Sequence, residues 1–263
     1  MTHKIILDTD PGIDDAMAIL FAEAHPAIDL LAITTVFGNA TIENGTRNAL
    51  WLKQKYGMKA DVAQGAAAPL LREPVGPTTV VHGPSGLGDV GAGEVTLTPD
   101  PRPAWQYIVE TLKANPGEIT LVTIGPLTNL ALALEAAPEI TSLVKQVVVM
   151  GGAFGVNGHR GNVTPYAEAN IHDDPEAADR VFTAPWPVVI IGLDVTQQSF
   201  FSSAYLDALR DDAGEPGRFL WAVSRFYLRF YSERIGLNGC HVHDPSAIAY
   251  VIDPELFTLR EGP

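Results

Sequence analysis

Short runs of apolar, β-branched residues alternate along this chain with longer segments whose apolar residues have helical spacing. The runs are almost continuously hydrophobic, which is typical of parallel strands that helices cover on both faces. We therefore expect an α/β fold with an open, mostly parallel central sheet flanked by helices. Strands are predicted over residues 4–8, 29–36, 118–124, 146–150 and 187–191. Helices are predicted to begin near Asp14, Thr41, Arg102, Leu127, Pro175 and Ser203.

The alternation continues through the whole chain, so we expect one domain over residues 1–263. Hydrophobic residues make up 46% of the chain and charged residues 18%, a balance that excludes disorder. Two long glycine-rich loops, over residues 69–93 and 151–165, have strands and helices on either side. They are therefore interpreted as loops within the domain and not as linkers.

The charge and cysteine content narrow the classes of partner. A formal net charge of −14 repels phosphate backbones and anionic lipid headgroups, so neither nucleic acid nor a membrane surface is an expected partner. The single cysteine, Cys240, permits no intramolecular disulfide, and the N-terminal residues lack a signal-peptide pattern. We expect a cytoplasmic protein that acts on a small molecule.

Four carboxylates stand within eight residues where the first predicted strand ends, in Asp8, Asp10, Asp14 and Asp15. Asp14 and Asp15 would complement the dipole of the helix that follows, which accounts for two of the four. Carboxylates this close repel one another unless a cation neutralises them. Their oxygen ligands suit Ca²⁺ or Mg²⁺, so the cluster predicts a site for a hard cation at the carboxyl end of this strand.

Two further segments carry polar residues whose meaning is open when each is taken alone. Asp244 lies in the segment CHVHDP and could complete a metal site, whereas His243 beside it could equally be an ordinary core histidine. Asn162, Glu168 and Asn170 lie in or just after a glycine-rich loop. Such side chains can hydrogen-bond a sugar, although asparagine and glycine also form ordinary solvated turns.

Taken together, these segments resemble the nucleoside hydrolases of the inosine/uridine-preferring type. The blocks that carry the resemblance, in order, are DTDPGIDDA, VFGN, VHGPSGLG, TIGPLTNLA, MGGA, GNVTPYAEANIHDDPEAA and CHVHDP. The resemblance extends from Lys4 to Pro254 and implies a Rossmann-like fold and a homodimer or homotetramer. Because members of the family continue further, we also expect the chain to lack a C-terminal stretch of about fifty residues.

The resemblance implies a role for each of the candidate residues. It implies Ca²⁺, with Mg²⁺ the less expected ion, bound by Asp10, Asp15, the carbonyl of Ile124 and Asp244, together with the ribose 2′ and 3′ hydroxyls and a water. It implies that Asp14, Asn39, Asn162, Glu168 and Asn170 hold the ribose and that His82, Tyr231 and His243 surround the base.

Chemistry and resemblance together predict hydrolysis of the N-glycosidic bond of a ribonucleoside to ribose and free base. Asp10 is the expected base that takes a proton from the attacking water, and inversion is the expected outcome. His243 is the first candidate for the acid that protonates the leaving base, and His82 is the second. Two alternatives remain open: a phosphatase similar to the haloacid dehalogenases, which also begin with a strand and Asp-x-Asp, and a noncatalytic ribose or nucleoside binder.

Overall fold

The computed structural model describes residues 2–262 and contains a central sheet of six parallel strands. The strand order is β3-β2-β1-β4-β5-β6. The strands are β1 (His3–Thr9), β2 (Ile28–Thr35), β3 (Asp61–Gln64), β4 (Ile119–Thr123), β5 (Gln146–Met150) and β6 (Val188–Ile191). The expected open parallel sheet is thus confirmed. The strand β3 was not predicted; it is a four-residue strand at the sheet edge with polar residues at both of its ends.

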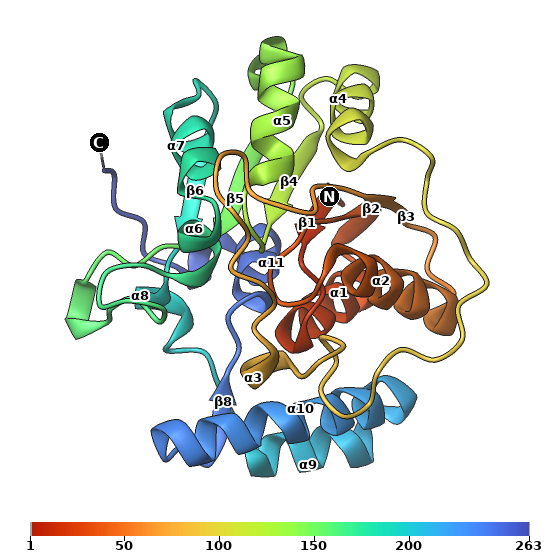
Figure 1. The fold of residues 1–263 in the computed structure, drawn as a ribbon, viewed down its shortest axis with the longest axis vertical. Coiled ribbons are helices and arrows are strands. Elements are labelled where there is room, and N and C mark those ends of the chain that lie inside the picture. The colour runs from red at the N-terminus through yellow and green to blue at the C-terminus, as the bar shows by residue number, and fades with distance from the viewer. Residues whose placement is uncertain (1, 263) are drawn as a thin grey trace.

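Helices cover both faces of this sheet (Figure 1). One face carries α4 (Ala104–Ala114), α5 (Thr128–Ala136) and α7 (Pro175–Thr183), and the other carries α1 (Ile13–Ala24), α2 (Ile42–Tyr56) and α11 (Pro245–Ile252). In β1, Ile6 packs into the first of these two cores, while Ile5 and Leu7 pack into the second. Successive side chains of a strand point to opposite faces, which is why strands buried on both sides are apolar throughout.

A helical hairpin at one end of the molecule adds a further layer over the second core (Figure 1). It consists of α9 (Ser203–Asp212) and the 22-residue α10 (Gly214–Ile235), which packs on α1. The sequence predicted α9 but not α10, because α10 begins with Gly-Glu-Pro-Gly and these residues resemble a turn. Proline is tolerated there because the first turn of a helix needs no intrahelical N–H donor.

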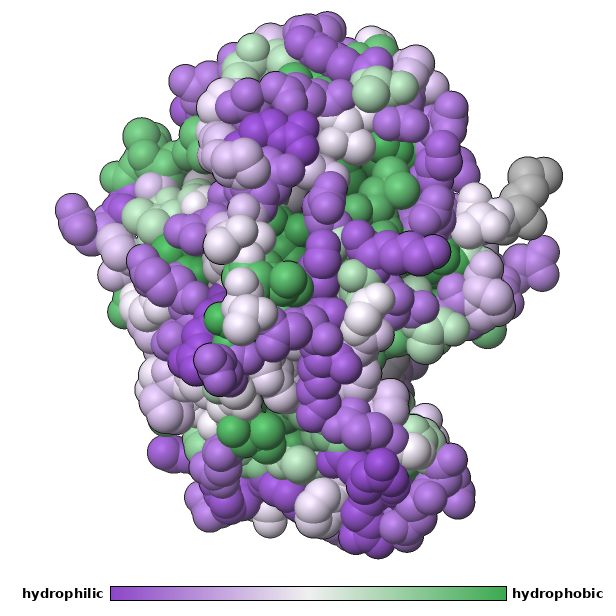
Figure 2. All heavy atoms as spheres, turned by 90° about the vertical axis from the view of Figure 1, so that its right-hand side faces the viewer, coloured by the Kyte–Doolittle hydropathy of each residue, from purple (hydrophilic) through white to green (hydrophobic). Residues whose placement is uncertain are grey.

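The remaining elements are short, and several carry candidate site residues. They are α3 (Thr79–His82), α6 (Ala169–Asp173), α8 (Leu193–Thr196), the antiparallel pair β7 (Phe200–Ser202) and β8 (Gly239–His241), and 3₁₀ turns at Pro138–Ser142, Val156–Gly158 and Pro254–Leu256. On the face in Figure 2, hydrophilic residues separate the hydrophobic patches. None of the helices within residues 2–262 is long and apolar enough to cross a membrane.

The strand order reverses direction at β1. The chain moves outward from β1 through β2 to β3 and then returns to place β4 on the other side of β1. The loops that leave β1 and β4 therefore run to opposite faces of the sheet, toward α1 and α5. In open α/β sheets, ligands bind beyond the carboxyl ends of the strands at such a point. The residues that follow β1 and β4 are thus the first place to look for a site.

Candidate functional site

The turn between β1 and α1 is held by Asp15. One carboxylate oxygen of Asp15 accepts hydrogen bonds from the Gly12 N–H at 2.8 Å and from the Asn39 side-chain amide at 2.9 Å. The other oxygen accepts the hydroxyl of Thr9 at 2.5 Å. Asp15 is fully buried. These bonds fix the orientation of its carboxylate, and they join the end of β1 to the segment that follows β2.

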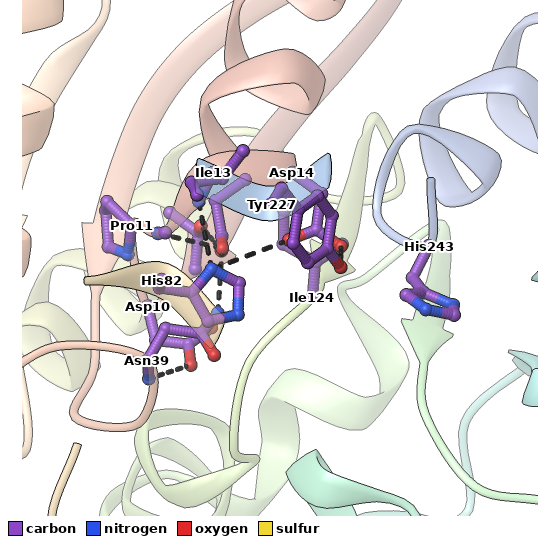
Figure 3. Close-up of polar contacts among 12 residues, drawn as sticks. Asp10, Pro11, Ile13, Asp14, Asn39, His82, Ile124, Tyr227 and His243 are labelled. Carbon is purple, nitrogen blue, oxygen red and sulfur yellow. Dashed lines mark hydrogen bonds and ion pairs between the residues drawn. The ribbon is translucent and has the colours of Figure 1, made fainter. Parts of the chain in front are cut away.

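Asp10 lies in the same turn, and only one of its two carboxylate oxygens accepts a hydrogen bond from the described residues (Figure 3). Its Oδ2 accepts the backbone N–H of Asn39 at 2.7 Å, whereas its Oδ1 is buried without a hydrogen-bond partner among the described residues. Burial raises the pKa of Asp10 well above its usual range, and the charge of Asp15 raises it further. A buried oxygen without a donor costs about 1–3 kcal/mol, so a ligand that bonded this oxygen would be stabilised there.

Three buried carboxylates face one another beside this turn. Asp14, Asp15 and Asp244 each offer an oxygen, and the three oxygens lie within 4.8 Å of one another. Burial raises the pKa of Asp14 to about 7, and burial together with the charges of Asp14 and Asp15 raises the pKa of Asp244 well above its usual range. Like charges this close need a cation between them to remain ionised. The donor set, composed of oxygens, fits a hard cation.

The carbonyl group of Ile124 lies at the end of β4 and accepts a hydrogen bond from the side-chain amide of Asn170 at 3.0 Å. The same amide donates to the carbonyl of Met150 at 3.1 Å, so Asn170 bridges the ends of β4 and β5. A carbonyl oxygen has two lone pairs, which leaves Ile124 one for a ligand. Asn162 is exposed, and its side-chain oxygen accepts the backbone N–H of Ala169 at 3.0 Å.

Glu168 caps the N-terminus of α6 from a buried position. Its carboxylate accepts backbone N–H groups from Asn170 at 2.9 Å, from Ile171 at 3.1 Å and from Gly152 at 3.0 Å. Burial nevertheless raises the pKa of Glu168 to about 7, because desolvation outweighs these bonds. Glu168 and Asn170 therefore lie at the carboxyl edge of β4 and β5.

His82 lies at the end of α3 against the first turn of α1 (Figure 3). Its Nδ1 accepts the backbone N–H of Ile13 at 3.1 Å and lies 4.0 Å from Asp14 Oδ1. An Nδ1 that accepts leaves the ring proton on Nε2 in the neutral imidazole. Burial lowers the pKa of His82 to about 4, so the ring is neutral at pH 7.

His243 lies farther along a row of aromatic rings. The ring of His82 contacts Tyr227 with 5.6 Å between centroids, and Tyr227 contacts Tyr231 edge-on at 5.0 Å. The Tyr231 hydroxyl lies 3.1 Å from His243 Nε2, while the hydroxyl of Thr196 lies 2.7 Å from His243 Nδ1. Burial lowers the pKa of His243 to about 3. Figure 3 shows the two histidines on opposite sides of Tyr227 and Asp14.

The structure thus gathers nearly all of the residues singled out in the sequence around the ends of β1, β4 and β5. Direct bonds or short distances link them in three groups: Asp10, Asp15 and Asn39; Asp14, Asp15, Asp244 and His82; and Ile124, Glu168 and Asn170. Tyr231 and His243 form the hydrogen-bonded pair described above, and Asn162 joins from the exposed loop.

Two residues of this region were missed in the sequence. Tyr227 donates to Asp14 Oδ2 at 3.4 Å, and Thr196 contacts His243. Tyr227 and Tyr231 are four residues apart, so on a helix they share one face. This spacing could have indicated Tyr227 if α10 had been predicted. Nothing in the sequence pattern around Thr196 distinguishes it from an ordinary turn residue.

The chain is similar to known proteins along nearly its whole length. The family described as inosine-uridine preferring nucleoside hydrolase matches residues 5–263. The chain is 41% identical over 260 residues to a protein of Oryza sativa subsp. japonica named probable uridine nucleosidase 1, covering 98% of this chain and 79% of that protein. It is 42% identical over 266 residues to the inosine-uridine preferring nucleoside hydrolase of Leishmania major, covering 100% of this chain and 83% of that protein.

A solved structure shares the fold closely. A plant nucleoside hydrolase superposes with a TM-score of 0.94 at 39% sequence identity, over 98% of this chain and 81% of that chain.

Proposed function

Because this chain belongs to the inosine-uridine preferring nucleoside hydrolase family and hydrolyses ribonucleosides to ribose and free base, we propose that Asp10 activates the attacking water. The observation that carries this proposal is the unequal state of the two Asp10 oxygens. Asn39 holds Oδ2, and Oδ1 has no hydrogen-bond donor among residues 2–262. Once a cation keeps Asp10 ionised, this oxygen can accept a proton from water.

The two alternatives from the sequence, a phosphatase and a noncatalytic binder, gain no support from the site. The carboxylates that crowd it would repel a phosphate group. The acidic chain as a whole, with a net charge of −14, also favours uncharged nucleosides over polyanions. We further propose a homodimer or homotetramer in the cytoplasm. The buried, unpaired Cys240 is consistent with a reducing compartment.

We propose that Asp10, Asp15, the carbonyl of Ile124 and Asp244 hold Ca²⁺, and that Asp14 is left for the ribose. The unpartnered Asp10 Oδ1 and the close oxygens of Asp15 and Asp244 support this assignment. When bound, the ion would neutralise the carboxylates, orient the ribose diol and lower the pKa of the attacking water. A set of carboxylate and carbonyl oxygens supplied by the protein favours Ca²⁺ over Mg²⁺, because Mg²⁺ usually keeps several waters.

Metal removal tests this assignment directly. Activity should disappear after dialysis against a chelator and should return on titration with Ca²⁺, less so with Mg²⁺. Isothermal titration of Ca²⁺ into the chelated protein should give a binding heat that Asp15→Ala abolishes, because Asp15 is the most rigidly held of the four ligands. Full activity in excess chelator, or unchanged Ca²⁺ binding in the variant, would contradict the proposed site.

We propose His243 as the acid that protonates the leaving base. Thr196 and Tyr231 contact its two ring nitrogens, so the ring is held in one orientation. The low pKa of about 3 keeps it neutral in the free protein at pH 7. Negative charge that develops on the departing base would raise the pKa of the ring, so that His243 takes up a proton from solvent and passes it to the base.

Varying the leaving group separates this role from a structural one. His243→Ala should lower kcat on inosine by about 10²- to 10⁴-fold, the usual contribution of a positioned acid. On nitrophenyl riboside the loss should be small, because nitrophenolate departs without a proton. Equal losses on both substrates would instead mean that His243 acts by holding its neighbour Asp244. The same pair of assays on His82→Ala would then show whether the acid is His82.

A further inference from the structure

The carboxylate of Asp10 lies between two glycines. Gly38 belongs to the segment after β2, and Gly125 follows β4. A Cβ atom added to Gly125 would lie 2.7 Å from Asp10 Oδ1, and a Cβ atom added to Gly38 would overlap Asp10 Oδ2. Real Cβ atoms essentially never approach another atom closer than 3.0 Å. Each oxygen of the carboxylate therefore occupies space that exists only because one of these residues is glycine.

The two glycines differ in what the backbone demands of them. Gly38 has a φ of +149°, a conformation that other residues rarely adopt, so glycine is needed there whatever the space. Gly125 is not among the glycines with positive φ, and its backbone would accept alanine without strain. Apart from Asp10, the nearest atom to its added Cβ is the Cγ1 of Val36, at 3.0 Å. The need for glycine at position 125 therefore comes from packing, with Asp10 as the closest neighbour.

We propose that Gly38 and Gly125 are positioning residues for the reaction, because together they form a slot that fixes the carboxylate of Asp10. The Asn39 N–H holds Oδ2 at one side of the slot at 2.7 Å. Gly125 leaves room at the other side for Oδ1, which has no donor in the described part of the chain. This inference rests on the proposed role of Asp10 as the base.

The slot matters because general-base catalysis depends on the placement of one oxygen. An alanine at position 125 would force Asp10 Oδ1 to move away from the added methyl group. A misplacement of about 1 Å at a reacting group can lower the rate by about 10²-fold. Binding of ribose through Asp14, Glu168 and Asn170 would be affected less, since the three atoms nearest to the added Cβ belong to Asp10 and Val36.

Gly125→Ala is the decisive variant, because the backbone permits alanine and the protein should fold. We expect kcat on uridine and inosine to fall by about 10²-fold with little change in KM. Gly45→Ala is the matched control. Its added Cβ would lie 3.2 Å from the ring of Pro11, the residue beside Asp10, and it contacts no atom of Asp10 itself. The control should leave kcat unchanged, and wild-type kcat in Gly125→Ala would overturn the proposal.

Two double variants show whether Asp10 or Val36 is the neighbour that the added methyl group displaces. If Asp10 is the residue displaced, Gly125→Ala should lower the urea midpoint of the wild type but should have little effect in an Asp10→Ala background, where the carboxylate is gone. Val36→Ala should not restore kcat to Gly125→Ala. Restoration by Val36→Ala, or an equal midpoint shift in both backgrounds, would overturn the slot. Retained activity in Asp10→Ala alone would show that Asp10 is not the base. The urea midpoints would still show whether the two glycines fix the carboxylate of Asp10.

Discussion

Replacing Asp10 with alanine is expected to lower kcat on ribonucleosides by about 10⁴-fold or more, since it removes both the base and an oxygen ligand of the proposed cation. Asp10→Asn should be nearly as damaging. Its side-chain oxygen could still accept the Asn39 N–H, but an amide cannot take a proton from water. Steady-state rates on uridine and inosine, measured in saturating Ca²⁺, separate the loss of the base from weaker metal binding.

Asp8→Asn is the matched control for this prediction. Asp8 lies on β1, two residues before Asp10, and is equally buried. Its Oδ1 accepts the Thr34 hydroxyl at 2.5 Å and the Asn129 amide at 2.8 Å, while its Oδ2, like Oδ1 of Asp10, has no partner among the described residues. Those bonds tie the sheet to α5. Burial raises the pKa of Asp8 to about 7, so an uncharged amide replaces it at modest cost. If Asp8→Asn were as inactive as Asp10→Asn, the effect would reflect the integrity of β1 and not a base at position 10.

The sheet was predictable because its strands are buried on both faces. A strand such as β5 must be apolar at every position to satisfy two cores, and this leaves a signal in the sequence that needs no tertiary information. β3 and α10 gave no such signal. β3 is a short edge strand, and α10 begins with residues that usually form turns.

The site was predictable where it is built from consecutive residues. Asp10, Asp14 and Asp15 lie in one turn, so their crowding is visible without a structure. Contacts that the fold creates between segments distant in the sequence could not be predicted in this way. Thr196 and His243 are 47 residues apart, and Tyr227 meets Asp14 across 213 residues. The packing of α8 beside β6 and of α10 on α1 brings these pairs together.

Nucleosides without the 2′ hydroxyl are expected to react about 10⁴-fold more slowly in kcat/KM, because a buried site built to bind a hydroxyl rejects an analogue that lacks it. The electron-withdrawing 2′ hydroxyl makes the glycosidic bond harder to break, so 2′-deoxyuridine is intrinsically the more reactive substrate. A slower reaction of 2′-deoxyuridine than of uridine can therefore come only from the protein.

Asp14 is the expected source of this discrimination. It is buried beside Asp15, and among residues 2–262 only the hydroxyl of Tyr227 donates to it from another side chain, to Oδ2 at 3.4 Å. A ribose hydroxyl would supply a closer donor. A hydrogen bond to a charged group contributes about 1.5–3 kcal/mol, so Asp14→Ala should reduce the preference for uridine over 2′-deoxyuridine by about 10- to 100-fold. Asp14→Ala must therefore slow uridine far more than it slows 2′-deoxyuridine. Equal slowing of both substrates would mean that Asp14 contributes to cation binding or to folding and does not hydrogen-bond the 2′ hydroxyl.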